Sequence, residues 1–86
     1  MTIVYKYPLN DRINYILVPA GSTFLRFGLD PSEMPAVWFH CDPAALGTDT
    51  YEFRLELTGQ AFDLPNYIYR GTLVKGPIVV HAFSNR

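Results

Sequence analysis

The chain has little charge, almost no cysteine and no long apolar run. Charged residues make up 17% of its 86 positions, and its one cysteine, Cys41, has no partner for a disulfide within the chain. No apolar stretch approaches the ~18 residues that a membrane-spanning helix needs. The N-terminus also lacks the basic segment and apolar core of a signal peptide. We therefore expect a protein of a reducing, cytoplasmic compartment that does not cross a membrane.

Net charge is also small, because seven basic residues face eight acidic ones, which gives a formal charge of −1. Such a balance supplies no strong field for wrapping nucleic acid and does not mimic a polyanion. The acids are unevenly placed, since residues 42–63 hold five acids and one base. This distribution predicts either an acidic and a basic side or ordinary solvated loops.

Apolar residues, by contrast, make up 49% of the sequence, which excludes a disordered tail and predicts a folded domain. With 86 residues, the chain forms one domain that spans positions 1–86. A domain of this size buries only about 60% of the surface that its unfolded chain exposes. We therefore expect self-association, as a dimer or higher oligomer, to contribute to stability.

β-Branched and aromatic residues dominate, while seven prolines and six glycines interrupt the chain too often for a long helix. The clearest strand is 51–57, in which apolar residues alternate with Glu52, Arg54 and Glu56, so that one face is buried and the other solvated. Six further segments are predicted as strands: 3–9, 15–18, 24–29, 36–41, 66–73 and 78–83.

Seven short antiparallel strands predict an all-β fold, either a small barrel or a two-sheet sandwich. Residues 42–47 allow at most one helical turn, with Asp42 as N-cap, Pro43 as first helical residue and Gly47 as the stop. The predicted core consists of Tyr51, Phe53, Leu55, Leu57, Leu25, Phe27, Val37, Phe39, Ile78 and Val80.

Residues with catalytic chemistry are scarce. His40, Cys41 and Asp42 are adjacent, but successive side chains of a strand point to opposite faces, and a nucleophile would have to come from Ser22 or Thr58. The sequence does not contain four suitably spaced ligands for a zinc ion. His81 is predicted as a half-buried histidine with one satisfied nitrogen. We expect a protein that is not an enzyme and holds no metal or cofactor.

Surface side chains therefore have to supply the function. We predict partner contacts by five residues: Glu52, Glu56, Tyr69, Arg70 and Trp38. Both glutamates are expected on the solvated face of their strand. Tyrosines near Lys6, Arg26 and Arg70 predict a patch that stacks a nucleotide or anchors a protein, or else tyrosines that line a barrel rim or a dimer seam.

The order of several short motifs resembles a family of small phage and prophage proteins without an assigned activity. These motifs are Tyr5-Lys6-Tyr7-Pro8-Leu9, Val18-Pro19-Ala20-Gly21-Ser22, Phe24-Leu25-Arg26-Phe27, Val37-Trp38-Phe39 with Asp42, Thr58-Gly59-Gln60-Ala61-Phe62, Tyr69-Arg70-Gly71-Thr72 and Val79-Val80-His81-Ala82-Phe83. Phe39-His40-Cys41 departs from the family's more aliphatic pattern, so the resemblance assigns no role to His40 or Cys41.

The resemblance implies an accessory protein that works in the cytoplasm of a host bacterium. Three classes of function then compete. The leading prediction is a protein-binding inhibitor of a host defence complex, such as a CRISPR effector, because a small domain can act by shape and charge without catalysis. The alternatives are a pocket that sequesters a nucleotide and a minor virion or assembly protein.

Overall fold

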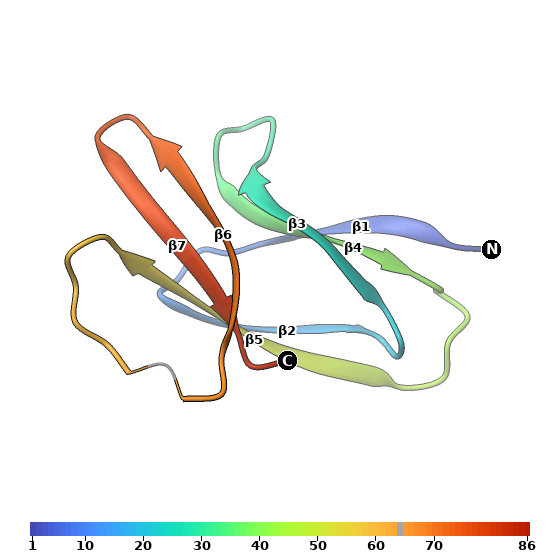
Figure 1. Cartoon of the computed structure of the whole chain (residues 1–86). Coiled ribbons are helices and arrows are strands. Elements are labelled where there is room, and N and C mark those ends of the chain that lie inside the picture. Colours follow the sequence, from blue (N-terminus) through green and yellow to red (C-terminus); the bar gives the residue numbers. More distant parts are fainter. Residues whose placement is uncertain (64) are drawn as a thin grey trace.

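The computed structural model describes residues 1–63 and 65–86 and contains seven strands in two antiparallel sheets (Figure 1). The strands are β1 (Ile3–Pro8), β2 (Ile13–Pro19), β3 (Thr23–Leu29), β4 (Pro35–Cys41), β5 (Thr48–Leu57), β6 (Ile68–Lys75) and β7 (Ile78–Ser84). The all-β prediction is confirmed. Of the two architectures left open, the molecule is a two-sheet sandwich and not a closed barrel.

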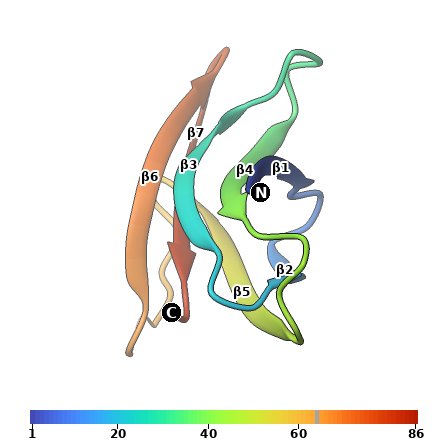
Figure 2. The same ribbon diagram turned by 90° about the vertical axis from the view of Figure 1, so that its right-hand side faces the viewer.

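The strand order is β1-β4-β3 in the first sheet and β2-β5-β7-β6 in the second. Only β3–β4 and β6–β7 pair strands that follow each other in the sequence, whereas β1 and β2 pair with strands much later in the chain. The sheets lie face to face, and β3 runs beside β6 along one side of the sandwich (Figure 2). Long-range pairing therefore holds the first two strands in place.

Aromatic rings fill the space between the sheets. Phe39 of β4 and Phe53 of β5 are fully buried, and the Phe39 ring lies 4.8 Å from that of Tyr51 and 5.7 Å from that of Phe24. Edge-to-face pairs of this kind contribute roughly 0.5–1.5 kcal/mol each beyond the burial of their surface. The alternation in β5 produces this arrangement, because Tyr51 and Phe53 both point inward.

Most of the predicted core is confirmed, since Tyr51, Phe53, Phe27, Val37 and Phe39 are buried and Leu55 and Val80 are partly buried.

Three predicted core residues are exposed instead. Leu25 is the extra residue of a bulge in β3, so its side chain turns away from the interior. Ile78 begins β7 beside the hairpin turn, beyond the reach of the opposite sheet. Leu57 ends β5 at an open end of the sandwich. Alternation gave the correct face for Leu57 but not the point at which the core ends.

Residues 42–47 form a turn and no helix. The Asp42 side chain accepts a hydrogen bond from the Ala44 N–H, and its carbonyl accepts one from the Ala45 N–H, each at 3.0 Å. Gly47 then continues at a φ of +84°, which glycine adopts without a steric penalty. The segment therefore makes one hydrogen-bonded turn that returns the chain to β5.

A bulge in β6 positions two residues that matter below. Its register shifts between Tyr69 and Gly71, so Tyr69 stays on the outer face while Arg70 turns inward. Gly71 has a φ of +139°, and a Cβ there would lie 3.7 Å from the Phe27 ring of β3. This distance is an ordinary contact, so the positive φ, and not a lack of space, favours glycine at this position.

Candidate binding site

A groove of about 360 Å³ opens at one end of the sandwich, between the two sheets. Its floor is apolar, and its rim is polar. The floor residues are Leu9, Met34, Pro35, Leu55, Leu57 and Val80, and the rim residues are Asn10, Asp11, Arg12 and Gln60. A hollow of this size and lining is suited to an apolar group whose edge makes a few polar contacts.

Several separate segments build the groove. Leu57 and Val80 are cross-strand partners of β5 and β7, and both point inward where the second sheet ends. Met34 comes from the β3–β4 connection, and the polar rim comes mostly from the β1–β2 connection. Leu57 and Met34 remain 44% and 43% exposed, so apolar surface at the groove is accessible to a partner.

Arg12 is fixed at the groove rim by a buried carboxylate. Its Nε lies 3.0 and 3.3 Å from the two oxygens of Glu56, and its Nη2 lies 2.9 Å from one of them. Arg54 adds a third donor, with its Nε 2.6 Å from Glu56 Oε2. The Arg12 side chain stays about half exposed, so it can also face a bound molecule.

Glu56 itself has no exposed surface. Burial raises the pKa of its carboxyl group, but the hydrogen bonds and charges of Arg12 and Arg54 outweigh burial and hold the pKa below its ordinary value. The group is therefore ionised at neutral pH and acts as an anchor for two arginines.

The prediction that Glu56 lies on a solvated face is wrong. The residue does point to the outer face of β5, but that face is covered. Phe62, from the connection after β5, packs on Phe83 with ring centroids 5.4 Å apart, and Arg54 lies over the Phe62 ring. The connection that directly follows β5 thus folds back over the strand, which alternation within β5 does not reveal.

Glu52 is partly buried on the same outer face, and the Tyr67 hydroxyl donates a hydrogen bond to its carboxylate. This glutamate is therefore engaged within the domain and presents only part of its charge to solvent.

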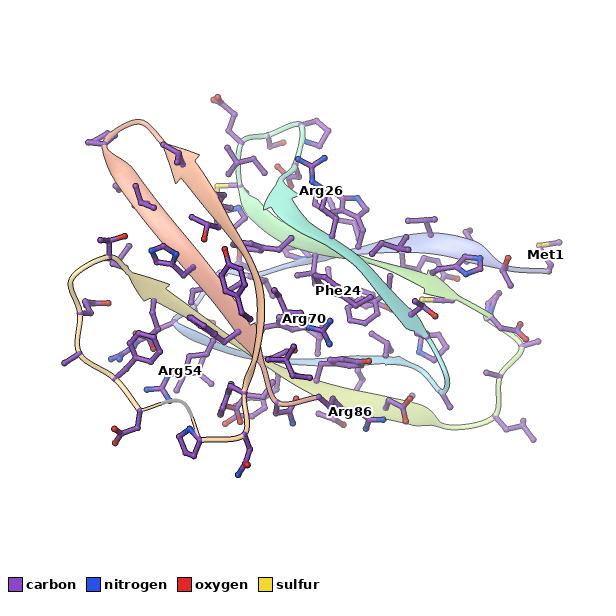
Figure 3. All side chains as sticks on the ribbon, in the orientation of Figure 1. Met1, Phe24, Arg26, Arg54, Arg70 and Arg86 are labelled. Atoms are coloured by element: carbon purple, nitrogen blue, oxygen red, sulfur yellow. The ribbon has the colours of Figure 1, made fainter. Side chains whose placement is uncertain are left out.

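Tyr69 and Arg70 lie on opposite sides of the second sheet. Tyr69 is exposed on the outer face, beside Phe83, and its hydroxyl lies within hydrogen-bond distance of the Thr72 hydroxyl. Arg70 points between the sheets, 4.6 Å from the Phe24 ring centroid (Figure 3). It donates hydrogen bonds to Ser84 Oγ and to the main-chain oxygen of Arg86, both at 2.8 Å. Arg70 is thus part of the interior packing, and Tyr69 is the surface residue.

Trp38 lies on the outer face of the first sheet, between its cross-strand partners Lys6 of β1 and Arg26 of β3. The Lys6 ammonium is 3.0 Å from the Asp30 carboxylate. A main-chain hydrogen bond from Met34 and the contact with Lys6 hold the pKa of Asp30 below its ordinary value. The structure therefore brings two of the three predicted cations beside Trp38, while Arg70 lies elsewhere.

His40, Cys41 and Asp42 do not assemble into a site. His40 Nε2 lies 2.8 Å from Thr2 Oγ1 at the surface, whereas the Cys41 thiol is buried and contacts the Phe39 carbonyl oxygen. The Asp42 side chain accepts a main-chain hydrogen bond in the turn at residues 42–47 described above.

His81 is partly buried, as predicted, but both of its ring nitrogens have partners. They lie 2.6 and 2.8 Å from the hydroxyl oxygens of Thr58 and Thr72. Within residues 1–63 and 65–86, no group of three histidine, cysteine or acidic side chains is arranged to hold a metal ion. That same part of the chain contains no helix that could span a membrane.

Sequence reasoning did not find the groove or Arg12. The segments that line it are far apart in the chain and carry no shared motif. The one available signal was Leu57, which ends a strong alternating strand beside Thr58-Gly59 and so marks an apolar residue where the sheet stops.

Together, the fold and the groove define a small two-sheet β-domain with an apolar hollow at one end. The chain belongs to the family described as a domain of unknown function (DUF7352), whose model matches residues 1–86. No curated protein and no solved structure matches the chain.

Proposed function

We propose that the protein is a non-enzymatic binding domain whose groove receives an apolar side chain of a partner protein. The observation that supports this proposal is the accessible apolar surface of Leu57 and Met34 within a preformed hollow. An apolar anchor that enters such a pocket dominates the energy of many protein interfaces. Arg12 adds a positive group at the rim, held in position by Glu56.

The groove favours a protein partner over a nucleotide. No aromatic side chain lines it among the described residues, and its one arginine already bonds Glu56. A nucleotide pocket needs a ring for stacking and several cations for phosphate. The row of Lys6, Trp38 and Arg26 on the other sheet supports nucleotide binding as a second, weaker candidate.

The partner that we propose is a subunit of a host defence complex, which the protein inhibits by occupying a contact surface. This part of the proposal rests on the resemblance to phage proteins described above. An inhibitor of this kind needs a stable shape and a surface with an apolar anchor and a polar rim, without catalytic groups. The groove supplies the apolar surface and the polar rim that such an interface needs.

The test begins with tagged full-length protein in bacteria that carry a defence system. Proteins and small molecules that copurify are identified by mass spectrometry. A defence subunit supports the proposal, a retained nucleotide supports the second candidate, and capsid or tail proteins alone support a virion role.

Calorimetry with the purified partner then locates the interface. Leu57→Lys places a charge in the apolar groove and should weaken binding about tenfold or more. Leu46→Lys, at an exposed position in the 42–47 turn, is the matched control and should bind as the unaltered protein does. Equal affinities for the two variants would exclude the groove as the interface.

A further inference from the structure

The second sheet ends in β2, an edge strand without the usual protection against pairing. Natural edge strands commonly carry a charge, a proline or a bulge that blocks a further strand. β1 contains Lys6 and Pro8, while β3 and β6 each contain a bulge and at least one basic residue. β2 has no charged residue and pairs with β5 in unbroken register, and its one proline, Pro19, is its last residue.

The outer face of β2 is a row of large apolar side chains. Ile13, Tyr15 and Leu17 are 41%, 66% and 60% exposed, whereas Asn14 and Ile16 between them are buried and partly buried. The row follows from the period of two of a strand, with Ile13, Tyr15 and Leu17 on one side of β2. Apolar surface beside an unprotected sheet edge is typical of an interface.

The main chain of the same three residues points to the free edge. The Leu55 N–H donates to the Arg12 carbonyl at 2.7 Å, so Arg12 and every second residue after it face β5. The N–H and C=O groups of Ile13, Tyr15 and Leu17 therefore point away from β5. In the described part of the chain, no other strand pairs with β2.

We propose that β2 pairs with β2 of a second copy of this chain, antiparallel and about a two-fold axis at Tyr15. This arrangement places Tyr15 opposite Tyr15 of the second copy and Ile13 opposite Leu17 of the second copy. Each of these facing pairs is apolar and uses main-chain groups that are free in the single chain, whereas Asn14 and Ile16, which also face each other across the axis, pair with β5. The two four-stranded sheets then form one continuous sheet, and both unprotected edges are covered.

A second copy of β2 fits this edge because the kinds of side chain along the exposed row have the same order in both directions. The row Ile13, Tyr15, Leu17 presents an aromatic centre with an aliphatic residue on either side, whichever way the strand runs. A register shifted by two positions would set Ile13 opposite Pro19, which has no N–H to donate. Ile13, Tyr15 and Leu17 do not line the groove, and the proposal does not depend on the proposed function.

Sedimentation equilibrium of the full chain over a range of concentrations tests the dimer. The unaltered protein should show a monomer–dimer equilibrium, and Tyr15→Lys should raise the dimer dissociation constant about tenfold or more, because two like charges would meet at the axis. Val74→Lys, an equally exposed apolar position on the β6 edge, is the matched control and should dimerise normally. A protein that is monomeric at every concentration, or equal dissociation constants for both variants, would overturn the proposal.

Two double variants test the register. Ile13→Lys with Leu17→Glu places opposite charges face to face in the proposed pairing and should keep the dimer, with an affinity that falls as salt is added. Ile13→Lys with Leu17→Lys places like charges there and should be monomeric. Circular dichroism of the monomers confirms that each variant folds. Identical association of the two double variants would show that the pairing is wrong.

Discussion

Glu56 and Arg12, 44 positions apart in the sequence, form an ion pair with an N–O distance of 2.9 Å. Glu56 is buried but Arg12 is half exposed, so removing Glu56 should cost no more than the low end of the about 3–5 kcal/mol that breaking a fully buried pair costs. We therefore expect Glu56→Ala to lower the free energy of unfolding by about 3 kcal/mol, measured by urea denaturation. Asp11→Ala removes an exposed acid from the same region and should change it by under about 0.5 kcal/mol. Equal effects would contradict the role of Glu56 as an anchor.

The acid sensitivity of the fold should depend on Glu56 and Asp30, whose pKa values both lie below the ordinary 4.5 and 3.8. Because each carboxyl group binds its proton more readily in the unfolded chain, the stability it contributes is present above the unfolded pKa and is lost as pH falls through the folded one. Unfolding free energies measured from neutral pH down to about pH 3 should therefore fall below about pH 4.5. In Glu56→Gln the unfolding free energy should fall less steeply at acid pH. The same pH dependence in this variant as in the unaltered protein would refute the contribution of Glu56.

Gly71 should be the least replaceable of the turn and bulge glycines. Its φ of +139° is strained for any residue with a Cβ, so we expect Gly71→Ala to cost about 1–3 kcal/mol. The control is Gly76→Asn, at a φ of +57°, because asparagine adopts this left-handed conformation readily. Thermal denaturation should show a clearly lower midpoint for Gly71→Ala than for Gly76→Asn, and the reverse order would be evidence against the bulge geometry.

Cys41 should be unreactive in the folded protein. The residue is 1% exposed and its thiol contacts the Phe39 carbonyl, so a colorimetric disulfide reagent should react only as fast as the domain opens. Addition of denaturant should make the reaction rapid. Leu46→Cys introduces a thiol at a position that is 95% exposed. In that variant, one thiol per chain should react rapidly with the reagent. Rapid labelling of the unaltered folded protein would show that the β4 end of the core is open.

The strands could be predicted from the sequence because their pattern is local. The period of two in 51–57 follows from the pleat of a single strand, and all six other predicted segments overlap observed strands. The residues at which the core ends could not be predicted from the sequence, because they depend on which strand lies opposite. Leu25 and Ile78 have the composition of core residues, yet a bulge and a hairpin turn remove them from it.

The candidate site could not be predicted for a related reason. Glu56 follows the alternation correctly, but its burial depends on Arg12 and on the connection that carries Phe62. Arg70 was predicted as a surface cation, whereas the bulge before Gly71 directs it toward Phe24. Each error arises from a contact between segments that are far apart in the chain.

The strand order also constrains how the chain folds as it is synthesised. β1 and β2 leave the ribosome long before their neighbours β4 and β5, so neither can complete a sheet at first. The hairpins β3–β4 and β6–β7 close over short loops and can form early, while the pairing of β2 with β5 must wait for about half the chain. The uncharged strand β2 is therefore the strand that waits longest with its main chain unpaired during synthesis.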